Sequence, residues 1–436
     1  MVFAILAGLL IFAFAIGLHV FVTLGLSGMA LAAIFSDRPI LSILGDITWN
    51  TASNVTLLAL PLYVLMGEIL LRTGITEGMY ESLSKWLNRL PGSLTHTNIV
   101  ASGMFACISG SSAATAATVG SVALPYLRKE KYDDRMALGS IAAGGTLGIL
   151  LPPSIVLIVY GVLAETSIGQ LYLAGVVPGV ILMVAFMTII AVYAILKPSM
   201  TPKSQPTSWS ERIYGLVHLV PIVLLVSLVV GSIYAGVATA TEAAAFGVSG
   251  AFVLGLAKRR ITFSVLADTF LATASTTAMI VAILISAFFL QFVASFLGIP
   301  NAMNQWMSGL GLSATETILM ICVIYIFLGM FMESLSIIVV TIPLLIPLLE
   351  PLGIDLVWFG IIVVILVEIA LITPPVGMNL FILRGISEKS KQEGQGTIKD
   401  IYIGVFPFVI ALLVVLALIV AVPEIVLWLP QSAMQK

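Results

Sequence analysis

Long apolar runs separated by short polar segments fill almost the whole chain. A run of about 20 apolar residues is long enough to cross the hydrocarbon core of a bilayer as a helix. Residues 2–35 form either one long tilted helix or two short helices broken near Gly17 to His19. Further crossings are predicted over residues 54–72, 171–196, 213–234, 240–257, 264–298 and 401–428. The pattern therefore predicts an all-α polytopic membrane protein.

Two further apolar runs carry a Pro-Pro pair in their middle, GGTLGILLPPSIVLIVYG from Gly144 and IALITPPVGMNLFILRG from Ile369. Proline removes a backbone donor, and the residue before it is pushed away from helical angles. Residues 135–165 and 356–385 should therefore each form two half-helices joined by a short unwound segment. Free backbone groups at membrane depth are tolerated only where they are buried in protein or line a cavity, so this pair of breaks indicates the binding site of a transporter.

Two other apolar runs, 97–127 and 317–349, are interrupted by small polar residues, SGSS at 109–112 and ESLS at 333–336. Each half of these runs is too short to span a bilayer comfortably. Each run therefore predicts a re-entrant helical hairpin with its tip at the polar residues. Residues 76–90 carry charges on one face and apolar side chains on the other, which predicts an amphipathic helix at the membrane interface.

The two halves of the chain repeat at an offset of 222 positions. Three pairs share this offset and the same predicted place: Pro125 and Pro347 at the end of a hairpin, Asp133 and Asp355 before a broken helix, and Pro152 and Pro374 in the breaks. We therefore divide the chain into a first repeat over residues 1–196, a linker over 197–212 and a second repeat over 213–436.

Lysine and arginine are distributed oppositely in the two repeats. Short cytoplasmic loops carry the excess of these residues. Residues 72–135 hold seven of them and the matching residues 294–357 hold none, whereas residues 162–196 hold none and the matching segment holds Arg384, Lys389, Lys391 and Lys399. The repeats should thus have inverted topology, with the first hairpin entering from the cytoplasm, the second from the opposite side, and a cytoplasmic linker.

The composition narrows the class of function. The chain is 60% hydrophobic and only 9% charged, with a formal net charge of −2, so nothing favours binding to nucleic acid. It shows no nucleophile–base set, phosphate-binding loop or metal-ligand spacing, and Cys107 and Cys322 lie in apolar runs as small core residues. An intramembrane enzyme or a purely structural scaffold is therefore disfavoured, and an ion gradient should supply the energy for transport.

The ends of the half-helices suggest the chemistry at the breaks. Helix N-termini favour an anion, whereas exposed carbonyls and C-terminal ends favour a cation, and hard cations take oxygen ligands. The first hairpin tip and broken helix offer hydroxyls and glycines: Ser109, Gly110, Ser111, Ser112, Thr115, Gly145, Gly148, Pro152 and Ser154. The second pair offers Glu333, Ser334, Ser336, Thr373, Pro374, Gly377 and Asn379. The alternative is that these small residues only let membrane helices pack closely.

Acidic residues in or beside apolar runs are further candidates, because intramembrane ionisable groups usually serve a function. These residues are Glu68, Glu165, Glu242, Glu333 and Glu368. They either carry protons or bind sodium, or they lie at the membrane interface or in hydrogen bonds between helices.

Six stretches together, SGSSAATAATVGSVALP, GILLPPSIVLIVYG, LYLAGVVPG, ATATEAAAFG, FLGMFMESLSIIVVTIPLLIP and ITPPVGMNLFI, resemble the large membrane subunit of tripartite ATP-independent periplasmic (TRAP) transporters over essentially the whole chain. The resemblance implies an elevator mechanism, in which two hairpins and two broken helices slide against a scaffold. It also implies sodium-coupled import of a small organic anion across the bacterial inner membrane. The implied partners are a small four-helix membrane subunit, expected as a separate chain, and a periplasmic substrate-binding protein.

The resemblance also implies roles for the candidate residues. Sodium ions should be held by Ser109, Gly110, Thr115, Gly145, Gly148 and Pro152 in the first half, and by Glu333, Ser334, Ser336, Thr373, Pro374 and Gly377 in the second. The substrate should contact Ser111, Ser112, Ser154 and Asn379. The alternative function is a single-component sodium symporter of the divalent-anion or citrate type, which takes up free substrate without a binding protein.

Overall fold

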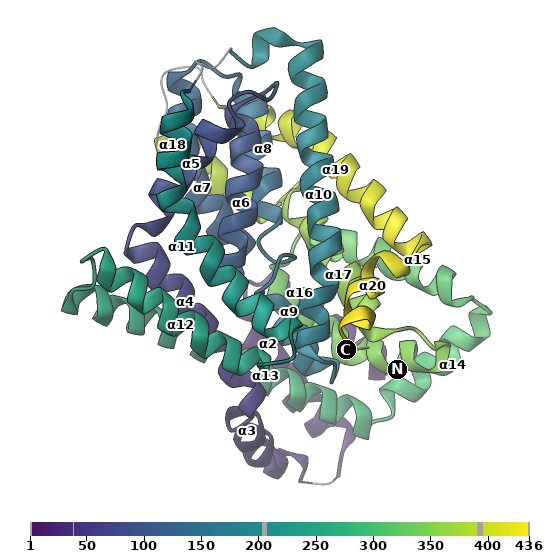
Figure 1. Ribbon diagram of the computed structural model, residues 1–436. Coiled ribbons are helices and arrows are strands. Elements are labelled where there is room, and N and C mark those ends of the chain that lie inside the picture. Colours follow the sequence, from purple (N-terminus) through teal and green to yellow (C-terminus); the bar gives the residue numbers. More distant parts are fainter. Residues whose placement is uncertain (1, 38, 203–206, 390–395, 435–436) are drawn as a thin grey trace.

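Helices account for all regular elements of the computed structural model, which describes residues 2–37, 39–202, 207–389 and 396–434 (Figure 1). The first half contains α1 Val2–Ala15, α2 Val20–Phe35, α3 Leu44–Ala52, α4 Ala59–Arg72, α5 Ile75–Leu87, α6 Leu94–Ser109, α7 Ser112–Lys129, α8 Asp134–Thr146, α9 Ile155–Leu163 and α10 Ile168–Leu196. The second contains α11 Trp209–Tyr234, α12 Ala240–Ala257, α13 Phe263–Phe296, α14 Ile299–Leu310, α15 Ala314–Gly329, α16 Ser334–Leu349, α17 Leu356–Leu371, α18 Met378–Lys389, α19 Ile398–Ala421 and α20 Glu424–Met434. Short 3-10 helices are η1 Ile40–Ile43, η2 Val55–Leu58, η3 Pro198–Met200 and η4 Glu350–Leu352.

Several of these helices are long and apolar enough to cross a membrane. Within the described residues they number seven, and four shorter apolar helices, among them α1, α2 and α17, accompany them. The prediction of an all-α, multi-pass membrane protein is confirmed. Residues 2–35 form two helices rather than one, because Gly17 adopts a left-handed φ of 79° between α1 and α2.

The prediction of one continuous membrane helix over residues 401–428 was wrong. The structure divides it into α19 and α20 at Val422 and Pro423. Pro423 has no N–H to continue the helix, and Val422 before it takes a non-helical ψ of 80°. Pro125 and Pro347 also lie inside α7 and α16 rather than at their ends.

The helices fall into two series at the 222-residue offset. When 222 is added to the residue numbers of α2, they fall within the range of α12, and those of α4 fall in the second half of α13. The contacts follow the same relation, since α2 packs on α13 while α12 packs on α4. The matching helices therefore make matching contacts.

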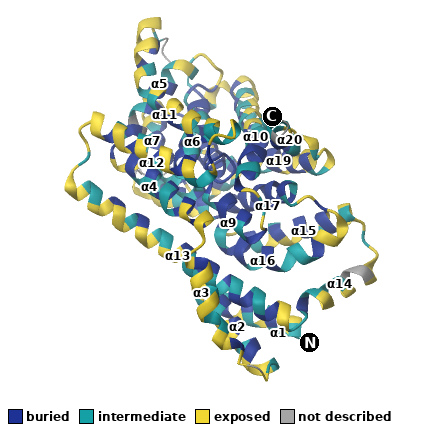
Figure 2. Cartoon of the chain, turned by 60° about the horizontal axis from the view of Figure 1, so that its bottom comes forward, coloured by how far each residue is buried: buried dark blue, intermediate teal, exposed yellow. Residues whose placement is uncertain are grey.

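The best-buried helices are those that carry the breaks. All of α8 from Met136 to Thr146 is buried, and α17 is buried from Phe359 to Leu371. Figure 2 shows buried residues in dark blue around α9 and α17, and exposed residues in yellow along α13 and α3. Such helices are hydrophobic all round because they pack against protein on every side.

Basic segments of the two halves meet at one end of the molecule, in the upper part of Figure 1. Arg128, at the end of α7, donates to Asp134 Oδ1 (3.2 Å) and to Ser387 Oγ (2.7 Å) near the end of α18. Arg135 Nε donates to Asp400 Oδ1 (3.0 Å) at the start of α19. The segments that the charge pattern assigns to one side of the membrane are therefore in contact. Lys391 and residues 203–206 of the linker lie outside the described residues.

Helix α5 covers most of the amphipathic helix predicted over residues 76–90, whose place at the membrane interface stays a prediction. Its apolar side chains Met79 and Leu83 are buried, and the helix packs on α6 and α11. Tyr80 also donates its hydroxyl to Asn98 Oδ1 on α6 (2.7 Å). The part of the apolar face formed by Met79 and Leu83 therefore packs against protein.

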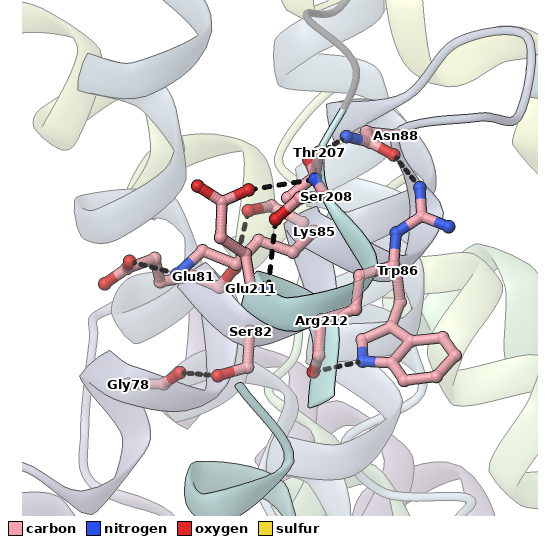
Figure 3. Close-up of polar contacts among 11 residues, drawn as sticks. Gly78, Glu81, Ser82, Lys85, Trp86, Asn88, Thr207, Ser208, Glu211 and Arg212 are labelled. Atoms are coloured by element: carbon pink, nitrogen blue, oxygen red, sulfur yellow. Dashed lines mark hydrogen bonds and ion pairs between the residues drawn. The ribbon is translucent and has the colours of Figure 1, made fainter. Parts of the chain in front are cut away.

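Polar contacts join the end of α5 to the start of α11 across the linker (Figure 3). Trp86 Nε1 donates to the carbonyl of Arg212 (3.2 Å), and Arg212 Nη2 donates to Asn88 Oδ1 (3.0 Å). The side chain of Asn88 also bonds Thr207. The first helix of the second half is thus held against the first half.

A close crossing of α8 and α19 gives the first testable prediction. A Cβ at Gly404 would lie 2.1 Å from the carbonyl oxygen of Arg135, so Gly404→Ala forces backbone apart. We expect this substitution to destabilise the protein by about 1–3 kcal/mol, the usual range for overpacking. Thermal unfolding in detergent measures it. Gly385→Ala is the control, because a Cβ at Gly385 would meet nothing within 4 Å, and an equal Tm for the two variants would contradict the crossing.

Candidate functional site

A cavity of about 260 Å³ lies between the two hairpin tips. From the first hairpin it is lined by residues 109–114, and from the second by Glu333, Ser334 and Leu335. Helices α4 and α13 close it from the other side with Gly67, Glu68, Leu71, Thr276, Met279 and Ile280. The structure thus brings together two polar segments that are more than 200 positions apart in the sequence.

Four helices begin at this cavity. Residues in or near the first turns of α7, α9, α16 and α18 line it, including Ala113, Ile155, Leu335 and Met378. Ser111 caps α7 by accepting a hydrogen bond from the Ala114 N–H (3.4 Å). Helix N-termini present free N–H groups and a partial positive charge, so their convergence favours a negatively charged ligand.

The first hairpin tip and the first break are in close backbone contact. A Cβ at Gly148 would lie 2.6 Å from both the N and the Cα of Ser112, and Ser112 Oγ donates to the carbonyl of Thr146 (3.3 Å). A Cβ at Gly110, whose φ is +58°, would lie 3.0 Å from the carbonyl oxygen of Pro153. Glycine is required at both positions because the two backbones approach so closely.

Hydroxyl groups cluster at the first tip. Ser109 Oγ lies 3.1 Å from Thr115 Oγ1, and Thr115 Oγ1 donates to the carbonyl of Ser111 (2.8 Å). Ser109 lies at the C-terminal end of α6, where free carbonyls carry a partial negative charge. This cluster offers the oxygen ligands that a hard cation prefers.

The second tip and the second break are more open. Glu333 lies at the N-cap position of α16, and Ser336 Oγ donates to its carboxylate (3.4 Å). Thr373 Oγ1 donates to the carbonyl of Ile369 (2.5 Å). Pro374 is exposed, whereas Pro152 in the first break is buried. The two breaks therefore share a sequence pattern but not an environment.

The predicted site residues fall into two groups by position. Those that line the cavity are Ser109, Gly110, Ser111, Ser112, Glu333 and Ser334. Those that lie behind or beside it are Thr115, Gly145, Gly148, Pro152, Ser154, Ser336, Thr373, Pro374, Gly377 and Asn379. Their roles toward sodium and substrate stay predictions.

Three of the second group have clear surroundings. Ser154 is fully buried, where its hydroxyl caps α9 by accepting from the Leu157 N–H (3.3 Å). Pro152 lines a separate apolar cavity of about 500 Å³ beside α10 and α11. Asn379 is buried, and its amide makes no hydrogen bond to the described residues; its Nδ2 lies 3.3 Å from the place of a Cβ at Gly145.

The acidic candidate residues also differ in their surroundings. Glu68 lines the cavity and forms an ion pair with Arg72 (2.9 Å). Glu242 accepts from the Thr239 N–H (2.8 Å) in the capping box of α12, and Glu165 is exposed. Glu368 is fully buried and makes no hydrogen bond to the described residues. The carboxylate of Glu242 therefore stabilises the start of α12 as a helix cap, which is a structural role rather than a role in transport.

Sequence reasoning missed the far wall of the cavity. This wall is lined by Thr276, Met279 and Ile280 of α13 and by Gly67 of α4. Glu68, which the sequence analysis named as an acidic candidate, lies on the same wall. These residues sit in long apolar helices and have no local signature, since a cavity-facing methionine resembles a lipid-facing one. The 222-residue repeat pairs α4 with α13 and was the one signal that could have drawn attention to both helices.

The cavity predicts a difference in cysteine accessibility. In a chain with Cys107 and Cys322 replaced by alanine, Ala113→Cys should react with a small thiol reagent at least about tenfold faster than Ala143→Cys, since the reaction requires an accessible thiolate. Ala113 lines the cavity, whereas Ala143 is fully buried in α8. The labelling rate in detergent measures this. Equal rates would show that the cavity is closed to the reagent.

Comparisons with known proteins agree with this architecture. The family described as "Tripartite ATP-independent periplasmic transporter, DctM component" matches residues 6–425. The C4-dicarboxylate TRAP transporter large permease protein of Pseudomonas aeruginosa is 34% identical, over 94% of this chain and 93% of that protein. The sialic acid TRAP transporter large permease protein of Vibrio cholerae is 32% identical, over 87% of each.

A longer relative and two solved structures extend the likeness. The isethionate TRAP transporter permease protein of Oleidesulfovibrio alaskensis is 29% identical over 94% of this chain, which covers 63% of that protein. The YdaH transporter of Alcanivorax borkumensis shares the fold with a TM-score of 0.62 at 16% identity, over 92% of this chain and 96% of that one. MtrF of Neisseria gonorrhoeae does so with a TM-score of 0.61 at 14% identity, over 92% and 94%.

The family match and the two large-permease relatives agree over nearly the full length of the chain. Both relatives are transport permeases, so the prediction that the protein is not an enzyme is confirmed. The chain belongs to the DctM family, the multi-pass large-permease component of tripartite ATP-independent periplasmic transporters.

Proposed function

We propose that this permease imports a small organic anion across the bacterial inner membrane, driven by a sodium gradient. The substrate is a dicarboxylate, sialic acid or a similar acid, delivered by a periplasmic binding protein. A small four-helix membrane subunit assembles with the permease. The names of the relatives from Pseudomonas aeruginosa and Vibrio cholerae support these two classes of substrate.

The cavity between the hairpin tips carries the proposal. Four helix N-termini converge on it, and Ser111 and Ser112 line it. A carboxylate placed there accepts hydrogen bonds from backbone N–H groups that have no helical partner. Ser154 and Asn379 support this wall from behind, the first by capping α9 and the second against Gly145.

The charges around the cavity support the proposal of sodium coupling. Glu333 lies at the same cavity, so an anionic substrate beside it is repelled unless a cation lies between them. The hydroxyl cluster at Ser109 and the carbonyls near the second break supply oxygen ligands for such cations. Substrate and sodium then stabilise one another in the site, which makes their transport coupled.

An elevator movement is supported by the way the cavity is built. One wall comes from the hairpins and broken helices, and the other from α4 and α13, which pack with α12 and α2. Sliding of the first group against the second would carry the cavity across the membrane. In this arrangement the hairpins are re-entrant, and the basic end that contains Arg128 and Arg135 faces the cytoplasm.

Uptake in proteoliposomes tests the function. The permease is reconstituted with its small membrane subunit, and a binding protein loaded with radiolabelled C4-dicarboxylate or sialic acid is added outside. We expect uptake only with an inward sodium gradient and only with the binding protein. Uptake that ignores the sodium gradient would overturn the proposal. Sodium-driven uptake of free substrate without the binding protein would favour the single-component symporter instead.

The sodium site at the first tip predicts the effect of Ser109→Ala. Loss of one ligand hydroxyl should raise the sodium concentration for half-maximal uptake about tenfold, since a lost polar contact costs about 1–1.5 kcal/mol. Ser121→Ala is the control, because Ser121 lies on the exposed face of α7 and its hydroxyl bonds, among the described residues, only the Thr118 carbonyl (2.9 Å). If Ser109→Ala lowers the Tm and leaves the sodium dependence unchanged, Ser109 serves packing alone.

A further inference from the structure

A second cavity, of about 110 Å³, lies between α8, α10 and α19. Polar side chains of Arg135, Tyr193 and Lys197 line it, next to apolar ones that include Ile189, Ile403 and Phe408. It lies at the basic end of the molecule, remote from the hairpin tips, and it shares no residue with the cavity proposed for substrate.

The polar groups of this cavity retain free hydrogen-bond donors. Arg135 uses its Nε on Asp400 (3.0 Å), and neither of its terminal nitrogens bonds a described residue. Lys197 Nζ lies 6.0 Å from the centre of the Tyr193 ring and forms no ion pair with the described residues. The Tyr193 hydroxyl also bonds none of them. An arginine, a lysine and a tyrosine thus present donors around one cavity.

The cavity is lined by two cationic side chains, Arg135 and Lys197, and by no acidic side chain of the described residues. The carboxylates of Asp133 and Asp400 lie close to Arg135. The carboxylate of Asp400 is already engaged, because it accepts hydrogen bonds from the N–H (3.1 Å) and hydroxyl (2.6 Å) of Thr397 as well as from Arg135. The carboxylate of Asp133 is engaged as well, because it caps α8 by accepting from the Arg135 N–H (2.9 Å). The unengaged donors of Arg135 and Lys197 therefore suit the anionic oxygens of a phosphodiester. Arginine is suited to such a group because its planar fork fits two oxygens at once.

The apolar side of the cavity indicates what the phosphate is attached to. Phe408 closes the inner end through an edge-to-face contact with Phe186, with ring centroids 5.6 Å apart. Ile195 of α10 and Phe406 of α19 expose apolar side chains on the outer surfaces of the same two helices. Both helices are long enough to cross a membrane, so these surfaces contact acyl chains.

We propose that this cavity binds the headgroup of an anionic phospholipid, with its phosphate against Arg135, Lys197 and Tyr193 and its acyl chains along α10 and α19. Basic and aromatic side chains at the end of membrane helices are the usual partners of such headgroups. The lipid would bridge α8, α10 and α19 where they meet the bilayer surface. The inference does not depend on the identity of the transported substrate.

Lipid-dependent stabilisation of the full chain tests the site. The purified protein is titrated in detergent with phosphatidylglycerol, with phosphatidylcholine and with inorganic phosphate, and the Tm and the lipid retained in native mass spectrometry are recorded. We expect phosphatidylglycerol alone to raise the Tm and to remain bound. If inorganic phosphate raises the Tm as much as phosphatidylglycerol does, the cavity is a site for free anions. If phosphatidylcholine raises the Tm equally, the charge of the headgroup is not recognised. Either result overturns the proposal.

Variants localise the effect. Lys197→Gln and Tyr193→Phe remove donors without breaking the ion pair of Arg135, so the fold is kept. Lys197→Gln should weaken the apparent affinity for phosphatidylglycerol about fivefold, the size expected for one basic contact at a membrane surface. Tyr193→Phe should weaken it by about the same factor, because it loses one hydrogen bond worth about 1 kcal/mol. Lys129→Gln, an exposed basic residue at the end of α7 outside the cavity, is the matched control and should bind as the unmodified protein does. Equal affinity in all four proteins would overturn the assignment.

Discussion

The need to cover free backbone groups inside the membrane organises this protein. Each Pro-Pro break releases N–H and carbonyl groups that lipid cannot satisfy. At the first break the structure covers them with the tip of a hairpin, with Gly148 against Ser112 and Gly110 against Pro153. Larger residues at these glycines would separate the two backbones. The first broken helix is therefore covered by the hairpin beside it, and both elements lie at the central cavity.

This arrangement determines the electrostatics of the cavity. A hairpin tip that covers a break is itself the end of one helix and the start of another. Two tips and two breaks consequently bring the starts of α7, α9, α16 and α18 to the same cavity. The partial positive charges of these starts add, while the carbonyl end of α6 lies at the cavity and that of α8 lies behind it. A site for an anion beside a site for a cation is thus a consequence of the fold before any particular side chain is chosen.

Local features of the fold could be predicted from the sequence, whereas contacts between distant segments could not. Proline and glycine act on their own backbone, so the breaks near Pro152 and Pro374 and the turn at Gly110 leave a direct signal. The far wall of the cavity, with Met279 and Ile280, depends on how α13 lies against the hairpins, and nothing local distinguishes these residues. The apolar face of α5 is compatible in the sequence with contact either to lipid or to protein. Only the packing of α5 on α11 shows that Met79 faces protein.

The difference between the two breaks is the clearest effect of tertiary structure on the repeat. Pro152 and Pro374 occupy matching positions, yet the first is buried beside α10 and α11 while the second is exposed next to Tyr402, whose hydroxyl donates to the Pro375 carbonyl (3.1 Å). An ion held near Thr373 could therefore exchange directly with the surroundings. One held behind Ser112 could exchange only through the cavity, past the substrate. Equal local chemistry in unequal surroundings would give the two proposed sodium ions different routes, and binding in a fixed order requires such a difference.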